Sequence, residues 1–282
     1  MRLSVLSDVW RSQGVLGTVQ SAKDRSIGTR SALAEEALTI ADGARGIEIG
    51  GPSGRFRRIL PIYSVMRAVD NVNFSGQTLW EGSLVEGTPF APTGTPTGIQ
   101  FLREATNLSG IADHSYDVIL SSHCLEHIAN PLRALREWRR ICSPEGYLCL
   151  IVPHRDGTFD RKRPVTPMKH YVSDEQNNVD ETDDTHFDEI IRLHDLHRDP
   201  GVRSAQDLKR RVAENQTLRA VHHHVFDLKM AVLLIREAGW TPIAAEARRP
   251  YDILILAQNY ARSLANCDPE LIVRGSPFKS DR

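Results

Sequence analysis

The stretch GIEIGGPSG, residues 46–54, decides the fold. The apolar run 46–49 predicts a short strand, and the glycines after it predict a tight turn. Glycine permits a positive φ and lets the backbone come close to a ligand. The run lacks the G-x-G-x-x-G pattern of pyrophosphate binders, and Pro52 removes an N–H that a phosphate would use. The turn therefore favours a ligand such as an adenosine without phosphates.

Strand-like and helix-like segments alternate on both sides of this turn. Tyr147–Val152 (YLCLIV) is apolar throughout, which is typical of a central parallel strand covered on both faces. Further strands are expected at 68–70, 99–102, 117–121, 241–246 and 252–257, the last two as an antiparallel hairpin at the sheet edge. Helices are expected at 32–41, 130–140 and 225–238. This alternation predicts an α/β fold with right-handed crossovers.

Residues 155–215 interrupt the alternation. Ten acidic residues lie between Asp174 and Asp199, where only Arg192 and Arg198 oppose them. We therefore expect an inserted polar lid and not more sheet. The predicted organisation has five parts: a helical cap at 1–45, a core at 46–154, the lid and acceptor region at 155–221, completion of the core at 222–260, and a tail at 261–282.

Composition excludes several classes of protein. The 282 residues contain 35 Lys and Arg against 36 Asp and Glu, so no basic excess predicts a nucleic-acid partner. No apolar run approaches the roughly 18 residues of a spanning helix, which predicts no membrane insertion. Asp8 and Arg11 interrupt any signal peptide, and the four cysteines are widely spaced. We expect a cytoplasmic protein with free thiols.

Two acids follow the glycine turn at positions suited to a nucleoside. Asp70 lies 22 residues past Glu48 at the expected end of the next strand, where an acid accepts hydrogen bonds from ribose hydroxyls. Glu104 follows the third strand, where an acid can accept from an adenine amino group. A surface position for both acids is the alternative interpretation.

With these residues in place, the chain resembles the class I S-adenosylmethionine (SAM)-dependent methyltransferases. It is most similar to the small-molecule group with an LEH signature, here Leu125–His127, and to a bacterial subset that shares GIEIGGPSG, LPIYSVMRAVDNVNF and PHRDGTFDRKRPVT. Members of that subset often accompany glycan-biosynthesis proteins. The resemblance covers roughly residues 40–155 and, more weakly, 222–258. It implies a doubly wound, mostly parallel, seven-stranded Rossmann-like sheet.

The resemblance also implies the cofactor, SAM, with S-adenosylhomocysteine as product, and the residues that hold it. Those residues lie in the glycine turn and at the ends of the next three strands, and they are Glu48, Gly50, Gly51, Pro52, Ser53, Asp70, Asn71, Glu104, Ala105, Ser121 and Ser122. Two departures stand out. GGPSG replaces the commoner G-x-G-x-G, which puts the contact with the cofactor carboxylate in doubt, and Pro144-Glu145-Gly146 replaces a structural Pro-Gly-Gly turn.

Methyl transfer from a sulfonium is an in-line displacement, and a hydroxyl acceptor must also lose a proton to a base. Histidine is the natural base near neutral pH. The candidates lie after predicted strands or before a helix, and they are His123, His127, His154 and, within the triplet 222–224, His223. Asp156 and Asp160 are placed to orient His154. For each histidine, a structural role such as a backbone hydrogen bond is the alternative.

The lid suggests a second chemistry. Asp183, His186, Glu189, His194 and Asp195 have the composition of a divalent metal site, although their spacing matches no known signature and a solvated acidic lid is favoured. Arg155, Arg161, Lys162 and Arg163 form a basic cluster that suits an anionic group on the acceptor, or pairing with the acidic stretch.

These observations favour SAM-dependent O-methylation of a sugar, a glycan end or another polar small molecule. Three alternatives stay open: an N- or C-methyltransferase, a non-catalytic SAM-fold module that binds a partner or senses the cofactor, and a metal-dependent hydrolase. The Asn/Asp-Pro-Pro-Tyr signature of many amino-nitrogen methyltransferases is absent after the fourth strand, which reads Ser121-Ser122-His123-Cys124. A homodimer is also left open.

Overall fold

The computed structural model describes residues 30–94, 98–260 and 275–281. Most of the predicted cap at 1–45 and most of the tail at 261–282 therefore lie outside the described residues. Within the described part, no helix is long and apolar enough to cross a membrane. The described cysteines, Cys124, Cys142 and Cys149, are free thiols, while Cys267 is not among the described residues.

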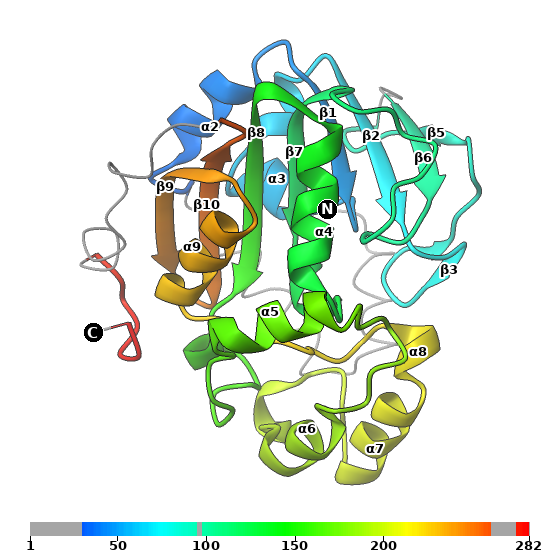
Figure 1. Ribbon diagram of the computed structural model, residues 1–282, viewed down its shortest axis with the longest axis vertical. Coiled ribbons are helices and arrows are strands. Elements are labelled where there is room, and N and C mark those ends of the chain that lie inside the picture. Colours follow the sequence, from blue (N-terminus) through cyan, green and yellow to red (C-terminus); the bar gives the residue numbers. More distant parts are fainter. Residues whose placement is uncertain (1–29, 95–97, 261–274, 282) are drawn as a thin grey trace.

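An eight-stranded sheet with the order β5-β6-β2-β1-β7-β8-β10-β9 forms the centre of the molecule (Figure 1). Its strands are β1 (Arg45–Ile49), β2 (Ala68–Asn73), β5 (Pro89–Phe90), β6 (Gly98–Leu102), β7 (Tyr116–Ser122), β8 (Cys142–Pro153), β9 (Thr241–Arg248) and β10 (Asp252–Gln258). The five strands from β6 to β8 are parallel, and β5, β9 and β10 pair antiparallel. The predicted α/β class with a mostly parallel sheet is confirmed, with the two-residue β5 as an eighth strand.

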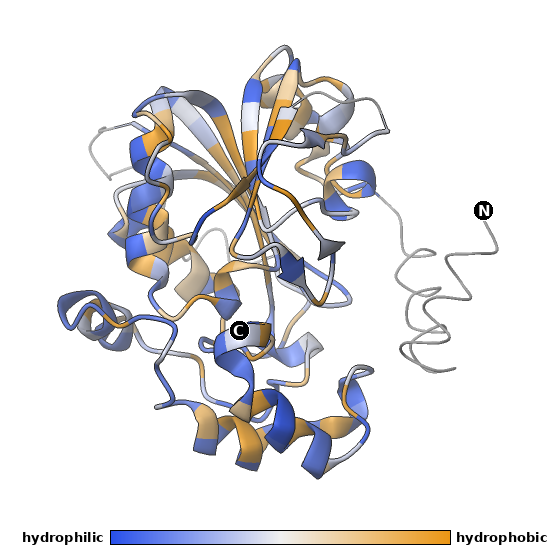
Figure 2. Ribbon diagram, turned by 90° about the vertical axis from the view of Figure 1, so that its right-hand side faces the viewer, coloured by the Kyte–Doolittle hydropathy of each residue, from blue (hydrophilic) through white to orange (hydrophobic). Residues whose placement is uncertain are grey.

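Apolar residues cover both faces of this sheet. Along β7, Ile119 packs into the core on one face, while Val118 and Leu120 pack into the core on the other. Because side chains alternate between faces along a strand, a strand buried on both sides must be apolar throughout. The same rule explains the apolar run at the end of β8. Figure 2 shows the hydrophobic residues concentrated in the strands of the sheet.

Helices pack on both faces of the sheet and also follow its carboxyl edge. They are α2 (Ala34–Ala41), α3 (Arg55–Arg58), α4 (Pro131–Ile141), α5 (Met168–Gln176), α6 (Phe187–Leu193), α7 (Ala205–Ala213), α8 (Asn215–Leu218) and α9 (Leu228–Glu237). Helix α4 begins with Pro131 after Asn130, whose side chain accepts a hydrogen bond from the Arg133 N–H. Helices α4 and α9 pack on one face of the sheet and α2 and α3 on the other.

Residues 155–221, for which we keep the name lid, contain helices α5 to α8 and no strand. These helices lie beyond the carboxyl ends of the parallel strands (Figure 1). They have a small apolar core of their own, formed by Ile190, Val202, Leu208, Val212 and Val221. The remaining short elements are β3 (Gln77–Thr78), β4 (Gly82–Ser83) and the 3-10 turns Ile62–Ser64, Leu125–His127, Arg155–Gly157 and Leu196–Arg198.

Candidate active site

The glycine turn after β1 fits closely against its neighbours. Gly50 has a φ of +81°, and a Cβ there would lie 2.8 Å from the Cys124 Sγ. A Cβ on Gly51 would lie 2.2 Å from the carboxylate of Glu48. Side chains at either position would therefore push the turn away from β1 and from the segment after β7. The turn needs glycine for this close approach.

Glu48 and two asparagines hold the turn in shape. The fully buried Glu48 carboxylate accepts hydrogen bonds from the Ser53 N–H at 3.0 Å and from the Tyr63 phenol. Burial raises the pKa of Glu48 to about 7, despite these bonds. The Asn71 amide pairs with both the N–H and the carbonyl of Gly51 at 3.1 Å, and Asn73 donates to the same carbonyl.

The other predicted cofactor residues lie around this turn or at the edge of the sheet. Ser53 and Ser122 share a hydrogen bond of 3.0 Å between their hydroxyls, and Ser121 donates to the Ile49 carbonyl. Pro52 lies in the turn and is half-buried. Glu104 accepts a hydrogen bond from Arg219 of the lid at 2.9 Å, and the Ala105 carbonyl accepts one from the Trp138 indole.

Asp70 does not lie where a ribose-binding acid is needed. Its carboxylate accepts hydrogen bonds from Arg45 at 3.1 Å, the Ile99 N–H at 2.8 Å and the Tyr116 phenol at 2.8 Å. These partners stand at the amino ends of β1, β6 and β7, on the side of the sheet away from the glycine turn. Strand β2 continues for three residues beyond Asp70 to Asn73. The predicted ribose contact does not fit this geometry.

His154 is also not placed to act as the base. Its ring is fully buried and stacks on Phe278 of the tail at 3.9 Å between centroids. Its Nδ1 accepts a hydrogen bond from the Asp156 N–H at 3.2 Å, and its Nε2 lies 3.1 Å from the Asp281 carboxylate. Because both ring nitrogens are engaged and the ring is sealed from solvent, an acceptor cannot reach them.

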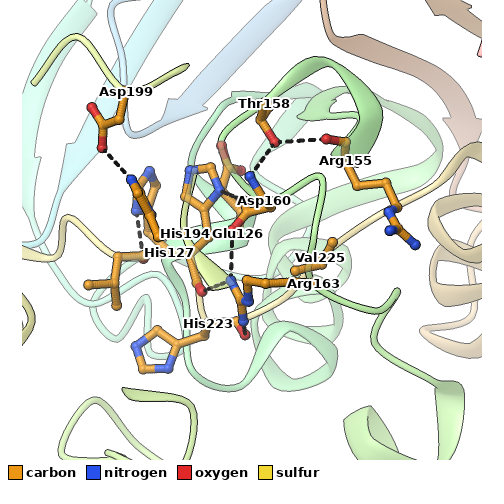
Figure 3. Close-up of polar contacts among 12 residues, drawn as sticks. Glu126, His127, Arg155, Thr158, Asp160, Arg163, His194, Asp199, His223 and Val225 are labelled. Atoms are coloured by element: carbon orange, nitrogen blue, oxygen red, sulfur yellow. Dashed lines mark hydrogen bonds and ion pairs between the residues drawn. The ribbon is translucent and has the colours of Figure 1, made fainter. Parts of the chain in front are cut away.

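Glu126 belongs to a buried polar cluster that follows β7, and it is labelled beside His127 in Figure 3. It is fully buried, and neither carboxylate oxygen has a hydrogen-bond partner among the described residues. The His123 Nδ1 lies 3.4 Å from it, while the His123 Nε2 lies 2.9 Å from Asp252. Burial raises the pKa of Glu126, but the imidazoles of His123, His127 and His222 outweigh burial and lower it to about 2.

His127 keeps one nitrogen available. Its Nδ1 lies 2.9 Å from the Val221 carbonyl, which can only accept, so Nδ1 carries the hydrogen and Nε2 carries a lone pair. The ring packs 5.3 Å from the exposed indole of Trp80 and 4.8 Å from His222. Burial and the neighbouring His222 lower the pKa of His127 to about 4. The imidazole is therefore neutral near pH 7, with the lone pair on Nε2.

His222 is held by an ion pair that the spacing of the sequence did not reveal. Its Nδ1 lies 2.5 Å from Asp160. Asp160 also accepts a hydrogen bond from the buried Arg163 at 2.9 Å (Figure 3). Arg163 further donates to the carbonyls of His222 and His223. Burial lowers the pKa of His222, but Asp160 outweighs this effect and raises it above its usual value. The sequence predicts that Asp160 orients His154. In the structure, Asp160 instead pairs with His222, which lies 62 residues further along the chain.

His223 is fully buried and turned away from this cluster. Its Nε2 lies 3.2 Å from the Asn215 Nδ2, and its Nδ1 faces Asp183 at 3.7 Å. It therefore does not reach the acceptor side of Glu126. In the acidic stretch, Glu189 pairs with Arg163, His194 with Asp199, and Asp195 with Arg161. These pairings do not bring the three residues together as the metal site that the sequence left open as the less favoured alternative.

Comparison with known proteins gives a family match over part of the chain. Residues 47–150 match the family model described as a methyltransferase domain. No curated protein matches the chain. Similar solved structures include a SAM-dependent methyltransferase from Mesorhizobium loti, with 14% identity over 80% of this chain and 95% of that one and a TM-score of 0.47.

Two further structures have comparable likeness. A putative SAM-dependent methyltransferase from Listeria monocytogenes is 15% identical over 80% of this chain and 95% of that one, with a TM-score of 0.46. The Burkholderia thailandensis 1,6-didemethyltoxoflavin-N1-methyltransferase, with bound S-adenosylhomocysteine, is 14% identical over 92% and 90%, with a TM-score of 0.45. The family match agrees with the predicted methyltransferase class over residues 47–150.

Proposed function

We propose that this enzyme transfers the methyl group of SAM to a hydroxyl group of a polar acceptor, such as a sugar or a glycan end. The observation that carries the proposal is the buried Glu126 carboxylate with the imidazoles of His123, His127 and His222 around it. This cluster lies directly after β7 and next to the glycine turn, through the contact of Gly50 with Cys124. Methyl donor and proton acceptor would thus be adjacent.

In this proposal the acceptor lies against His127 and Trp80. The indole of Trp80 is 58% exposed and packs beside the His127 ring, so it offers an apolar face for one side of a sugar. Bound SAM would supply the methyl group that its sulfur loses to the acceptor oxygen, and the His127 Nε2 would take the proton of the hydroxyl. Glu126 stabilises the imidazolium that forms, and S-adenosylhomocysteine leaves.

The cofactor is proposed to lie over the glycine turn, against Gly50, Gly51, Pro52 and Ser53, with Ser122 beside the methyl group. Glu48 and Asn71 act by shaping the turn, since their polar atoms are taken by the turn itself. Glu104 and Ala105 remain proposed adenine contacts. In place of Asp70 we propose Glu81 for the ribose, because its charge lies close enough to Glu48 to contribute to the raised pKa of that residue.

Replacing Glu81 by glutamine is expected to weaken SAM binding by about 10- to 100-fold, because hydrogen bonds to a charged group contribute about 1.5–3 kcal/mol. Isothermal calorimetry on the folded variant measures this change. Glu86, an exposed acid in the same connection that pairs with Arg103, provides the matched control. If E81Q and E86Q bind SAM equally well, the assignment of the ribose to Glu81 is wrong.

Asp70→Asn is expected to change stability and not affinity. The substitution weakens the bonds from Arg45, Ile99 and Tyr116, and we expect the free energy of unfolding to fall by about 1–3 kcal/mol. SAM affinity should stay at the wild-type level. Urea denaturation and calorimetry on the same preparation measure both quantities. A stable variant that no longer binds SAM would return Asp70 to the cofactor site.

The acceptor class is tested with SAM that carries a labelled methyl group. The full chain is incubated with matched panels of monosaccharides, glycan fragments, amines and thiols, and the labelled product is identified by mass spectrometry. Label on a hydroxyl oxygen of a sugar is the expected result. Label only on nitrogen, carbon or sulfur would contradict O-methylation, and SAM binding without transfer to any acceptor would favour the non-catalytic module.

A further inference from the structure

We propose that the lid contains a binding site for a divalent transition metal of the zinc class, formed by His170, His186 and His224, with the Asp174 carboxylate beside them. His170 and Asp174 stand one turn apart on α5, His186 directly precedes α6, and His224 lies in the segment before α9. Three segments that are distant in the sequence thus contribute one ligand set. The site is separate from the reaction proposed above.

The distances suit a four-coordinate ion. One nitrogen from each of the three histidines lies within 4.8 Å of the others. The Nε2 atoms of His170 and His186 are 3.0 Å apart, and the Asp174 Oδ2 lies 3.5 Å from the His170 Nε2. A tetrahedral ion with bonds of about 2.0–2.1 Å separates its ligands by about 3.3–3.4 Å. The separation of 3.0 Å between His170 and His186 lies slightly below this value, and the His224 nitrogen is within 4.8 Å of both.

Two buried polar atoms in this group lack a hydrogen-bond partner among the described residues. The Asp174 Oδ2 is one of them, in a residue that is only 7% exposed. It lies 3.5 Å from the His170 Nε2 and 3.7 Å from the His224 Nε2. The His224 Nδ1 is the other. Buried polar atoms are rarely left unpaired without a functional reason, and a bound cation would satisfy such a carboxylate.

His224 also has the outer hydrogen bond that is typical of metal ligands. Its Nε2 lies 3.1 Å from the Ala129 carbonyl, so this nitrogen carries the hydrogen and Nδ1 carries the lone pair. A histidine that ligates a metal nearly always donates its other N–H to a carbonyl or carboxylate, which fixes the tautomer and the ring orientation. The ring centroids of His186 and His170 lie 5.3 and 5.7 Å from that of His224.

A neighbouring group, Asp183, His186 and His223, is less suitable. The Asn215 Oδ1 accepts from the Ala220 and Val221 N–H groups, so the Asn215 Nδ2 must donate to the His223 Nε2. His223 therefore keeps its hydrogen on Nδ1 and has no lone pair to offer. A third group, Glu126, His127 and His222, belongs to the proposed reaction site.

Metal binding at this site would fix the position of the lid. It would link α5 and the start of α6 to His224, which stands two residues from His222. Because His222 contacts His127, the metal would hold the lid against the side of the molecule where the acceptor is proposed to bind. Metal binding that joins segments in this way stabilises the folded state.

The test uses the full chain, stripped of metal with a chelator and titrated with Co²⁺, whose visible spectrum reports four-coordinate binding. We expect one equivalent to bind and Zn²⁺ to displace it. His186→Gln and His170→Gln should each weaken Co²⁺ binding by more than about 100-fold, since even outer-shell changes cost 10- to 100-fold. His197→Gln, at an exposed histidine of the lid, is the matched control and should bind like the wild type.

Circular dichroism identifies any variant that fails to fold. The His170 side chain is 34% exposed, so H170Q should disturb folding little and serves as the second variant next to H186Q. Wild-type protein that binds no Co²⁺ would overturn the proposal. Folded H170Q and H186Q variants that both bind like the wild type would also overturn it. Loss of binding in His127→Gln but not in H186Q would place the metal at Glu126 instead, and would overturn the assignment to the lid.

Discussion

His127→Ala is expected to lower kcat by about 100- to 10,000-fold, the range typical for loss of a positioned general base. The reason is that His127 is the imidazole beside Glu126 whose Nε2 has a lone pair and no hydrogen bond among the described residues, while its Nδ1 is fixed by the Val221 carbonyl. SAM binding should stay close to wild type, since the turn 50–53 is unchanged. Steady-state assays with the acceptor found by the labelling screen, together with calorimetry, separate the two effects.

His114→Ala is the control for this experiment. His114 lies before β7, at the opposite end of that strand, where its Nδ1 contacts the Cys142 carbonyl at 2.9 Å. We expect its kcat to stay near wild type. If His127→Ala turns over at the rate of His114→Ala, then His127 is not the proton acceptor.

Arg163→Met should lower the free energy of unfolding by about 3–5 kcal/mol, the usual cost of removing one partner from a buried ion pair. Arg163 is 1% exposed and donates to Asp160 at 2.9 Å, to Glu189 at 2.8 Å, and to the carbonyls of His222 and His223. The substitution leaves these acceptors without their donor in a buried region. Because His222 depends on Asp160, we also expect slower turnover.

The matched control is Arg210→Met on α7. Arg210 and Asp207 form an exposed pair at 3.3 Å, and exposed pairs contribute at most about 1 kcal/mol. Urea denaturation of both variants measures the difference. A loss of less than about 1 kcal/mol in R163M would show that the buried pair does not stabilise the lid against the core.

Most of the fold could be predicted from local pattern. The apolar run in β8, the glycine turn after β1 and the hairpin of β9 and β10 each left a clear signal, because burial on both faces and positive φ restrict residue choice directly. The short β5 has no alternation to detect. Helix α9 begins three residues later than predicted, because Asp227 caps it by accepting from the Met230 N–H.

The candidate site was less predictable because it depends on strand ends and on distant partners. The sequence suggested that β2 ends at Asp70, whereas three further residues carry the strand to Asn73 and leave Asp70 near the amino edge. His154 was assigned from its place after β8, but Phe278 and Asp281, more than 120 residues away, cover it. Local spacing cannot reveal such contacts.

The most direct test of this account is a calorimetric titration of the purified full chain with SAM and with S-adenosylhomocysteine. We expect both ligands to bind at one site with micromolar dissociation constants. We also expect that E81Q weakens the binding of both and that D70N weakens neither. Absence of binding by protein that circular dichroism shows to be folded would contradict the central claim, and the turn at 50–54 would then have only a structural role.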